Sequence, residues 1–298
     1  MTRQVSPSAM RPYGVSRTCR VLEIPRSTFH ACKARLLDPK PPRKRGPKGP
    51  WGDEALLGEI RRVLESSPWN GEGHRKVWAR LRFEGVRTSK GRVLRLMREA
   101  GLLAPVRVGK PRGPQAHEGT IIPDRANVMW GTDSTTTLTR LEGTATVFIA
   151  VDHASAKGVG IHAAKKGTRY EALEPLRQGI REEFGAYEEG VAAGLSLRHD
   201  HGSPFVSEVY QDELHFLGAE SSPSFVRAPE GNGCAERFIR TLKEQLLWIR
   251  SFDTVEELRL ALHHFLDRYN REWIVERHGY ITPAEAHRRL RRCAEDAA

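Results

Sequence analysis

The chain has 298 residues, enough for two or three domains with cores of their own, so a single small module is excluded. Its net charge of +11 is unevenly distributed: residues 1–112 carry 26 Lys and Arg against nine Asp and Glu, whereas 113–298 have a net charge of −6. A basic front half is typical of a protein that binds a polyanion, and a merely solubilising charge is the alternative.

Several classes of protein are disfavoured by what the sequence lacks. The four cysteines form no Cys-x-x-Cys pair, so we assign no structural zinc. There is no long apolar span, no segment that resembles a signal peptide, and no Gly-x-x-x-x-Gly-Lys loop for nucleotide hydrolysis. We expect a protein of a reducing cytoplasm that does not contact a membrane.

The first 52 residues are interpreted as two parts. Residues 1–37 predict a short helix-turn-helix-like segment, with helices over 16–22 and 27–35 capped by Ser16 and Ser27. Residues 38–52 are rich in Pro, Lys and Arg and predict a stiff basic linker.

Residues 53–104 predict a DNA-binding helix-turn-helix domain. Apolar residues at helical spacing indicate helices over 53–68, 74–83 and 89–100, with a glycine turn before the last one. The last helix of such a domain enters the major groove. A small basic bundle used for packing or self-association is the alternative. The side chains that we expect to contact DNA are Lys90, Arg92, Arg95 and Arg98.

A second linker, 105–123, leads to an α/β domain over 124–298. Apolar runs predict strands at 128–132, 146–151, 159–161, 195–199 and 224–227. Helices are expected at 168–184, with Pro175 kinking or delaying it, at 207–217 and from Cys234 onward. Two capping boxes, Asp253 with Glu256 and Thr282 with Glu285, predict the helices 254–268 and 283–292.

Three acids of this domain are candidates for a metal site. Asp133 and Asp200 each end a predicted strand, and Glu236 lies on an amphipathic helix. Hard cations prefer carboxylate oxygens, and two ions about 3.5–4 Å apart can activate an attacking oxygen and stabilise a leaving one. The pattern favours two-metal phosphoryl transfer; three unrelated surface acids are the alternative.

Other polar residues near these acids are weaker candidates for contacts with a metal ion or phosphate. Arg240 and Lys243 follow Glu236 at helical spacing, and we expect them to contact phosphates, although a solvated face is the alternative. Asp152 also ends a strand and is interpreted as structural or as a support for the metal ligands. The histidines that could bind a metal or phosphate, but lack a spaced partner, are His153, His199 and His201.

Three motifs carry a family resemblance. They are the Trp130–Thr135 run around Asp133, the Asp-His-Gly-Ser block from Asp200 and the Asn-x-x-x-Glu block from Asn232 to Glu236, with 35 residues between Asp200 and Glu236. The chain resembles the DDE transposases of bacterial insertion sequences, of the second-frame type, whose catalytic core is that of retroviral integrases. The tail departs from the family's pattern at Trp273, Val275 and His278.

The resemblance implies an RNase H-like fold, with a mixed five-stranded sheet flanked by helices, after the all-α region. It implies that Asp133, Asp200 and Glu236 are catalytic and hold two Mg²⁺ ions, for which Mn²⁺ can substitute. The activity implied is cutting of insertion-sequence ends and their joining to target DNA.

The implied partners are double-stranded DNA, further copies of the chain on DNA, because two element ends must be held together, and a protein from a partner reading frame. The implied location is the cytoplasm of a bacterium, at the nucleoid. Two alternatives remain: a domesticated DNA-binding regulator that keeps the fold without transposition and, more remotely, a nuclease of similar fold.

Overall fold

The computed structural model describes residues 4–37, 50–105, 121–224 and 229–295. The chain divides into two compact units, Met1–Pro50 and Trp51–Ala298. Most of the two expected linkers, 38–49 and 106–120, lies outside the described residues. In the described part of the chain, no helix is both long and apolar enough to cross a membrane.

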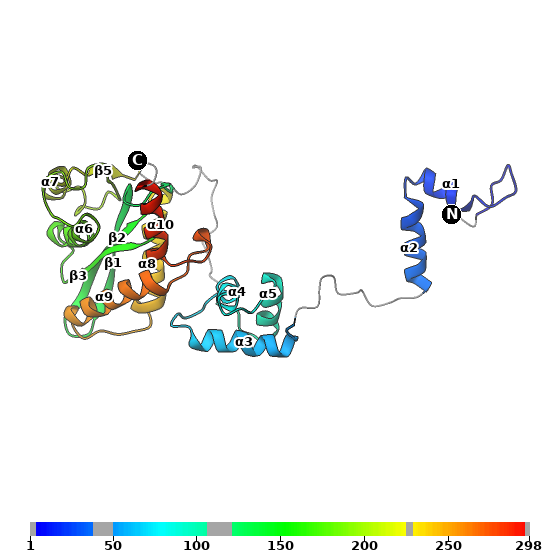
Figure 1. The fold of residues 1–298 in the computed structure, drawn as a ribbon, viewed down its shortest axis with the longest axis horizontal. Helices are drawn as coiled ribbons and strands as arrows, with labels where there is room; N and C mark the ends of the chain where they lie inside the picture. Colours follow the sequence, from blue (N-terminus) through cyan, green and yellow to red (C-terminus); the bar gives the residue numbers. More distant parts are fainter. Residues whose placement is uncertain (1–3, 38–49, 106–120, 225–228, 296–298) are drawn as a thin grey trace. The chain divides into compact units, whose positions relative to one another are not determined.

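The first unit contains the two helices expected there, α1 (Gly14–Val21) and α2 (Arg26–Leu37) (Figure 1). The predicted cap of α1 is wrong. The residue before the helix is Tyr13, and Ser16 already lies within the first turn. The predicted cap of α2 is also wrong. The helix begins at Arg26, directly after Pro25, whose carbonyl accepts from the Phe29 amide at 3.2 Å, so Ser27 already lies within the first turn.

The second unit begins with the three predicted helices, α3 (Asp53–Ser66), α4 (His74–Phe83) and α5 (Lys90–Glu99). Their apolar faces meet in a core of their own. Ser89 caps α5, because its hydroxyl accepts a hydrogen bond from the Arg92 amide at 3.2 Å. The fully buried centre of this core comprises Leu56, Ile60, Val77, Leu81, Val93 and Met97.

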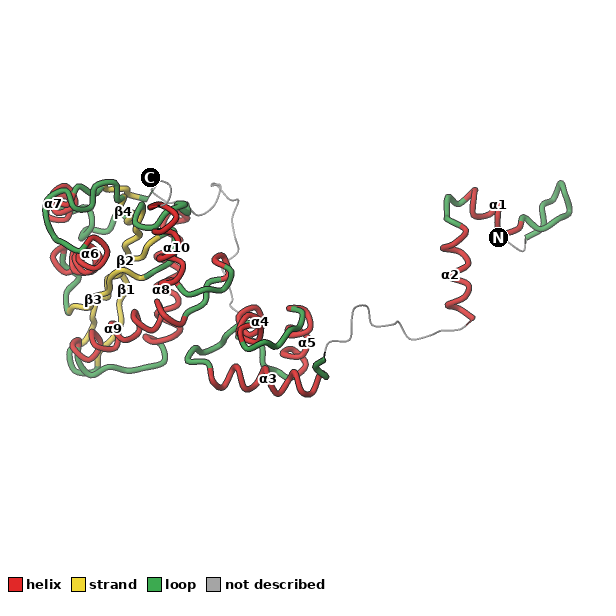
Figure 2. The backbone as a smooth tube through the Cα atoms, viewed as in Figure 1, coloured by secondary structure: helices red, strands yellow, loops and turns green. Residues whose placement is uncertain are grey.

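The rest of the unit is built on a five-stranded sheet of order β3-β2-β1-β4-β5 (Figure 2). The antiparallel meander comprises β1 (Met129–Thr139), β2 (Gly143–Asp152) and β3 (Gly158–Ala164). Next to β1 lie the parallel strands β4 (Ser196–His199) and β5 (Glu220–Pro223).

Helices cover both faces of this sheet (Figure 1). Phe148 and Ala150 of β2 pack on the side of α6 (Arg169–Phe184) and α7 (Glu208–Leu217). Val147, Ile149 and Val151 pack on the side of α8 (Gly233–Leu242) and α9 (Val255–Glu272). Burial of both faces explains the continuous apolar run that predicts β2. The shorter elements are η1 (Pro229–Asn232), the π-helical turn η2 (Lys243–Leu247), η3 (Glu276–His278) and the last helix, α10 (Pro283–Glu295).

The predicted architecture is thereby confirmed: a mixed five-stranded sheet flanked by helices, preceded by an all-α region. The fifth strand lies at a different position from the predicted one, 224–227. It spans Glu220–Pro223, whereas 225–227 of the predicted strand lie outside the described residues. Its sequence, Glu-Ser-Ser-Pro, has no apolar pattern, and only its parallel pairing with β4 defines it.

The delayed start predicted as one effect of Pro175 is wrong, because α6 begins directly after its cap, Thr168, and continues through the proline. A Cβ on Gly160 of β3 would come 2.0 Å from the Pro175 carbonyl oxygen. The glycine therefore lets β3 and α6 pack closely. We attribute the continuation of α6 through Pro175 to this packing, which offsets the missing backbone donor.

The first capping box is one residue later than predicted. Thr254, not Asp253, caps α9: its hydroxyl accepts from the Glu257 amide at 3.1 Å, while the Glu257 carboxylate accepts from the Asp253 amide at 2.8 Å. The cap predicted before α10 is confirmed, because the Thr282 hydroxyl accepts from the Glu285 amide at 3.3 Å.

The loop after α3 joins the three-helix region to the sheet domain. Trp69 is buried in the core under α8 and α9, and its ring meets that of Trp273 edge to face at 5.0 Å. The Gln245 side chain bonds both the amide and the carbonyl of Asn70, at 2.8 and 2.9 Å. Trp273, one of the departures from the family's tail pattern, thus packs within this junction.

Candidate active site

The pairing of β1 with β4 brings the first two candidate acids to adjacent strands. The parallel register ends at the pair Gly131 and Arg198. Asp133 and Asp200 each lie two residues beyond that pair, at the same edge of the β1–β4 pairing. Asp133 is in the middle of β1 rather than at its end as predicted, because β1 continues to pair with β2 as far as Thr139.

The third acid, Glu236, comes from the first turn of α8. The apolar face of this helix is buried against the sheet, and Glu236 lies on the exposed face. The start of the helix is attached to β1 directly before Asp133, because the Asn232 side-chain amide donates to the Thr132 carbonyl at 2.9 Å. The buried apolar face of α8 and the hydrogen bond from Asn232 thus place Glu236 on the side of the sheet that carries Asp133.

The three acids affect one another's charge. Burial raises the pKa of Asp133 to about 6, and the negative charges of Asp200 and Glu236 add to this rise. A hydrogen bond from the Ser134 amide, 2.7 Å long, and the positive charge of Lys243 act in the opposite direction. The structure therefore brings Asp133, Asp200, Glu236 and Lys243 into one electrostatic neighbourhood.

The donor set fits divalent cations chemically. Carboxylate oxygens are the hard ligands that Mg²⁺ prefers, and a cation would relieve the repulsion that helps to raise the pKa of Asp133. In the described part of the chain, no three His, Cys, Asp or Glu side chains are grouped closely enough to hold a metal ion. The arrangement is thus a set of neighbouring acids and not a formed metal cage.

The two basic residues expected beside Glu236 differ in their surroundings. Arg240 pairs with Glu244 at 3.0 Å on the outer face of α8. Lys243, at the start of the π-helical turn, is the cation that acts on Asp133.

Most of the basic side chains expected to contact DNA from α5 have partners within the chain. Arg92 donates to Asp53 and to the Trp51 carbonyl, and it is half-buried. Arg95 pairs with Asp53 at 2.7 Å and with Glu99. The two ion pairs with Asp53 hold the start of α3 against α5.

Lys90 and Arg98 lie at opposite ends of α5. Lys90 is 3.9 Å from Glu276, and its ammonium lies over the rings of Trp78 and Tyr280. Arg98, in the last turn, is exposed.

Hydrogen bonds hold the three candidate histidines within the fold. Nε2 of His199 is 2.9 Å from the Ser221 hydroxyl, and Nε2 of His201 is 2.8 Å from the Ser224 carbonyl. Nδ1 of His153 contacts the Ile121 carbonyl at 3.2 Å, and burial lowers its pKa. These contacts favour structural roles.

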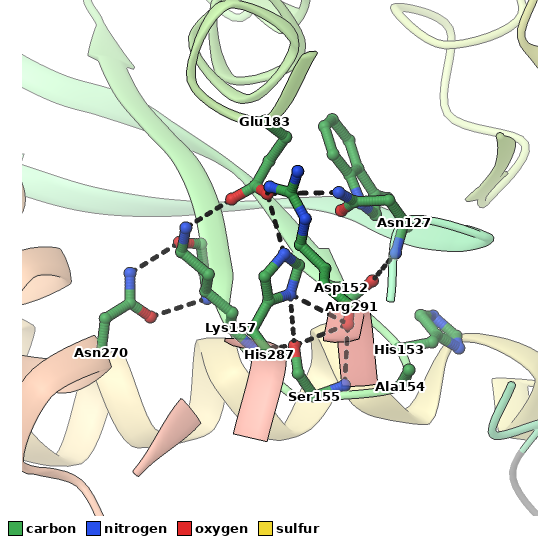
Figure 3. A network of polar contacts seen from close by, with 12 residues as sticks. Asn127, Asp152, His153, Ala154, Ser155, Lys157, Glu183, Asn270, His287 and Arg291 are labelled. Carbon is green, nitrogen blue, oxygen red and sulfur yellow. Dashed lines mark hydrogen bonds and ion pairs between the residues drawn. The ribbon is translucent and has the colours of Figure 1, made fainter. Parts of the chain in front are cut away.

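Asp152, at the end of β2, belongs to a buried polar network (Figure 3). Its carboxylate accepts from the Asn127 amide at 2.9 Å and from the hydroxyl and amide of Ser155. His287 of α10 lies between Asp152 and Glu183 of α6, with its Nε2 2.8 Å from the Glu183 carboxylate. This network joins three elements and supports the structural interpretation of Asp152.

Arg198 is a polar residue near the acids that the sequence analysis does not single out. It is buried on β4, two residues before Asp200, and its guanidinium reaches the carbonyl of Gly231 and the hydroxyl of Ser222. The available signal in the sequence is a charged residue within a short predicted strand in which apolar residues alternate.

Comparison with known proteins gives matches in both halves of the second unit. A family model described as an HTH-like domain matches residues 51–110, and one described as an integrase core domain matches residues 217–283. The transposase for insertion sequence element IS629 of Shigella sonnei is 28% identical, with 92% of this chain aligned to 91% of that protein. The transposase InsD for insertion element IS2 of Escherichia coli is 26% identical over the same shares.

A comparison with solved structures finds the catalytic core domain of BIV integrase. It is 20% identical, the match covers 55% of this chain and 95% of that domain, and the TM-score is 0.41.

Proposed function

We propose that this chain, a member of the insertion-sequence transposases with an integrase-type core, cuts element ends and joins them to target DNA by two-metal phosphoryl transfer at Asp133, Asp200 and Glu236. The activity class, a DNA transposase, follows from its relatives and its integrase core domain. The observation that carries the proposed site is the pairing of β1 with β4, which brings Asp133 and Asp200 to the same edge of adjacent strands. Glu236 is near enough for its charge to act on Asp133.

The role proposed for the three acids is to hold two Mg²⁺ ions, for which Mn²⁺ can substitute. Bound ions would supply an activated water or 3′ hydroxyl and a stabilised leaving oxygen. The protein positions the DNA strand and neutralises phosphate charge near the acids. Lys243 suits that second task, because its charge already acts on Asp133, and Arg240 presents a second cation one turn earlier.

A direct test uses the full-length protein with a duplex that carries the element end. Mg²⁺-dependent cutting, followed by joining of the new 3′ end to a second duplex, is the expected result. Because a proton competes for Asp133, the affinity for Mn²⁺ should fall as the pH is lowered through about 6. Specific binding of the end with no cutting in either metal would favour the regulator instead.

The three-helix region is proposed to supply recognition of the element end. The HTH-like match and the basic side chains of α5 support this assignment. To contact phosphates, Lys90 would have to leave Glu276, and Arg95 would have to leave Asp53 and Glu99. Arg92 also supports the start of α3 through the Trp51 carbonyl.

Arg98→Ala is expected to weaken DNA binding in a salt-dependent manner. Each phosphate contact contributes a slope of roughly −0.9 to the dependence of log K on log salt, so the slope should become shallower by about that amount. Fluorescence anisotropy at several salt concentrations measures it. Arg271→Ala, which removes an exposed arginine on α9 that pairs with Asp267, is the control. An unchanged slope for Arg98→Ala would remove that residue from the interface.

The active form is proposed to be an oligomer on DNA, because two element ends must be held together and each chain carries a single triad of these acids. A partner reading-frame protein is a further proposed component. Since both substrates are DNA, the proposed place of action is the bacterial nucleoid.

A further inference from the structure

The junction between η1 and α8 is held from two strands at once. On one side, Nε of Arg198 donates to the Gly231 carbonyl at 3.3 Å, while Nη1 donates to the Ser222 hydroxyl at 2.9 Å and to the Pro223 carbonyl at 3.4 Å. The guanidinium thus connects β4, the end of β5 and the last turn of η1. Arg198 is only 7% exposed.

On the other side, Asn232, which follows Gly231, holds the junction to β1. Asn232 is 5% exposed, and its amide donates to the Thr132 carbonyl at 2.9 Å. Gly131 leaves room for this contact: a Cβ there would come 2.5 Å from Oδ1 of Asn232 and 2.6 Å from Nε2 of His153. The close approach of the asparagine to β1 therefore requires glycine at position 131.

Each of the three acids lies a short covalent distance from these contacts. Asp200 is two residues after Arg198, and Asp133 directly follows Thr132. Glu236 is four residues after Asn232, which is about one helical turn. A shift of the junction would therefore move Glu236 relative to both strand acids.

We propose that Arg198 and Asn232 are positioning residues that together clamp the start of α8 and so set Glu236 against Asp133 and Asp200. The inference rests on the proposed function for its catalytic consequence. It concerns the chain's own geometry, so a metal-binding measurement can test it without turnover.

The chemistry of the two side chains suits this role. Arginine presents five N–H donors in a rigid planar fork, so a single side chain can reach acceptors on three segments, which the single ammonium of lysine does less well. Burying a cation costs stability unless its donors are satisfied, and the partners of Arg198 given above are neutral oxygens rather than carboxylates. An apolar residue at this position of β4 could make none of these hydrogen bonds between segments.

The test compares Arg198→Lys and Asn232→Ala with the wild type in the full-length chain. Outer residues that orient metal-binding carboxylates typically contribute 10–100-fold to affinity or activity, so we expect kcat for Mg²⁺-dependent cutting to fall by about 10–100-fold. The KM for DNA should stay unchanged. Mn²⁺ affinity, measured by electron paramagnetic resonance, should fall in parallel. Loss of buried hydrogen bonds should lower the melting temperature, but both variants should remain folded at the assay temperature, which circular dichroism checks.

Arg259→Lys is the matched control, because that guanidinium also donates to a backbone carbonyl, that of Ala163, but on the far strand β3. It should cut and bind Mn²⁺ like the wild type. If Asn232→Ala fails to fold, Asn232→Asp replaces it: the side chain has the same size but turns an acceptor toward the Thr132 carbonyl.

Wild-type cutting rate and Mn²⁺ affinity in both folded variants would overturn the clamp and leave the proposed function standing. A wild-type protein that does not cut would overturn the proposed function instead. The Mn²⁺ affinities would still decide the clamp in that case.

Discussion

Glu236→Gln is expected to lose Mg²⁺-dependent strand cutting almost completely. The change removes one negative charge and one oxygen ligand from the proposed metal site but keeps the size of the side chain. Residues that only support metal ligands already contribute about 10–100-fold, so loss of a ligand should lower the cutting rate by at least about 100-fold. Single-turnover cleavage of an end-labelled duplex measures this rate.

The same variant should fold and bind DNA as the wild type does. Glu236 lies on the exposed face of α8, opposite the buried side chains that attach this helix to the sheet. The melting temperature of the Glu236→Gln protein should therefore hardly change. Its affinity for DNA should stay equal to that of the wild type or rise, because a negative charge is lost. Asp267→Asn, which removes an exposed acid on α9 that pairs with Arg271, is the control. A Glu236→Gln protein that cuts at the wild-type rate would exclude Glu236 from the site.

The order of elements was predictable because each carries a local signal. The periodicity of α3 to α5, the apolar run of β2 and the cap before α10 are all patterns within a few residues of one another. Errors arose where pairing over a long distance decides the structure. The polar strand β5 is defined by β4 alone, and β1 extends beyond Asp133 only because β2 lies beside it.

The candidate site follows the same division. Motifs single out Asp133, Asp200 and Glu236, but the register of β1 with β4, which makes the first two neighbours, cannot be read from either strand alone. Arg198 escaped notice for a related reason. Its partners are backbone and hydroxyl oxygens of residues 24 or more positions away, and no spacing rule predicts such contacts.

The partners of the basic side chains of α5 also depend on tertiary contacts that the sequence does not show. Sequence alone indicates a basic helix suited to the major groove, whereas the folded chain gives Arg95 and Arg92 a shared acid, Asp53, from the start of α3. Competition between such an acid and phosphate would lower affinity for arbitrary DNA. The basic composition of the region is therefore a poor guide to how many phosphates it contacts.

His287→Ala is expected to destabilise the fold by about 3–5 kcal/mol near pH 6, because it removes the buried partner of two carboxylates. Both Asp152 and Glu183 are almost fully buried. Among the described residues, Glu183 keeps Lys157, Asn127 and Arg291 as donors once the imidazole is gone (Figure 3). Chemical denaturation followed by circular dichroism gives the free energy of unfolding.

The difference between wild type and His287→Ala should depend on pH with a defined sign. Burial acts to lower the pKa of His287, but Asp152 and Glu183 outweigh it and raise that pKa above its ordinary value of 6.5. The stabilisation from the charged imidazole is therefore complete below pH 6.5 and is lost as the pH rises through the raised pKa. The pKa of Glu183 and of Asp152 is lowered despite their burial, chiefly by His287, so their contribution is present above about pH 4.5 and is lost in acid. The stability difference should therefore be largest between about pH 4.5 and pH 6.5 and shrink toward pH 9.

His287→Gln keeps a hydrogen-bonding side chain but cannot titrate, so the pH dependence of the stability difference should be lost in this variant. A stability difference between wild type and His287→Ala that is flat from pH 5 to pH 9 would contradict a charged His287.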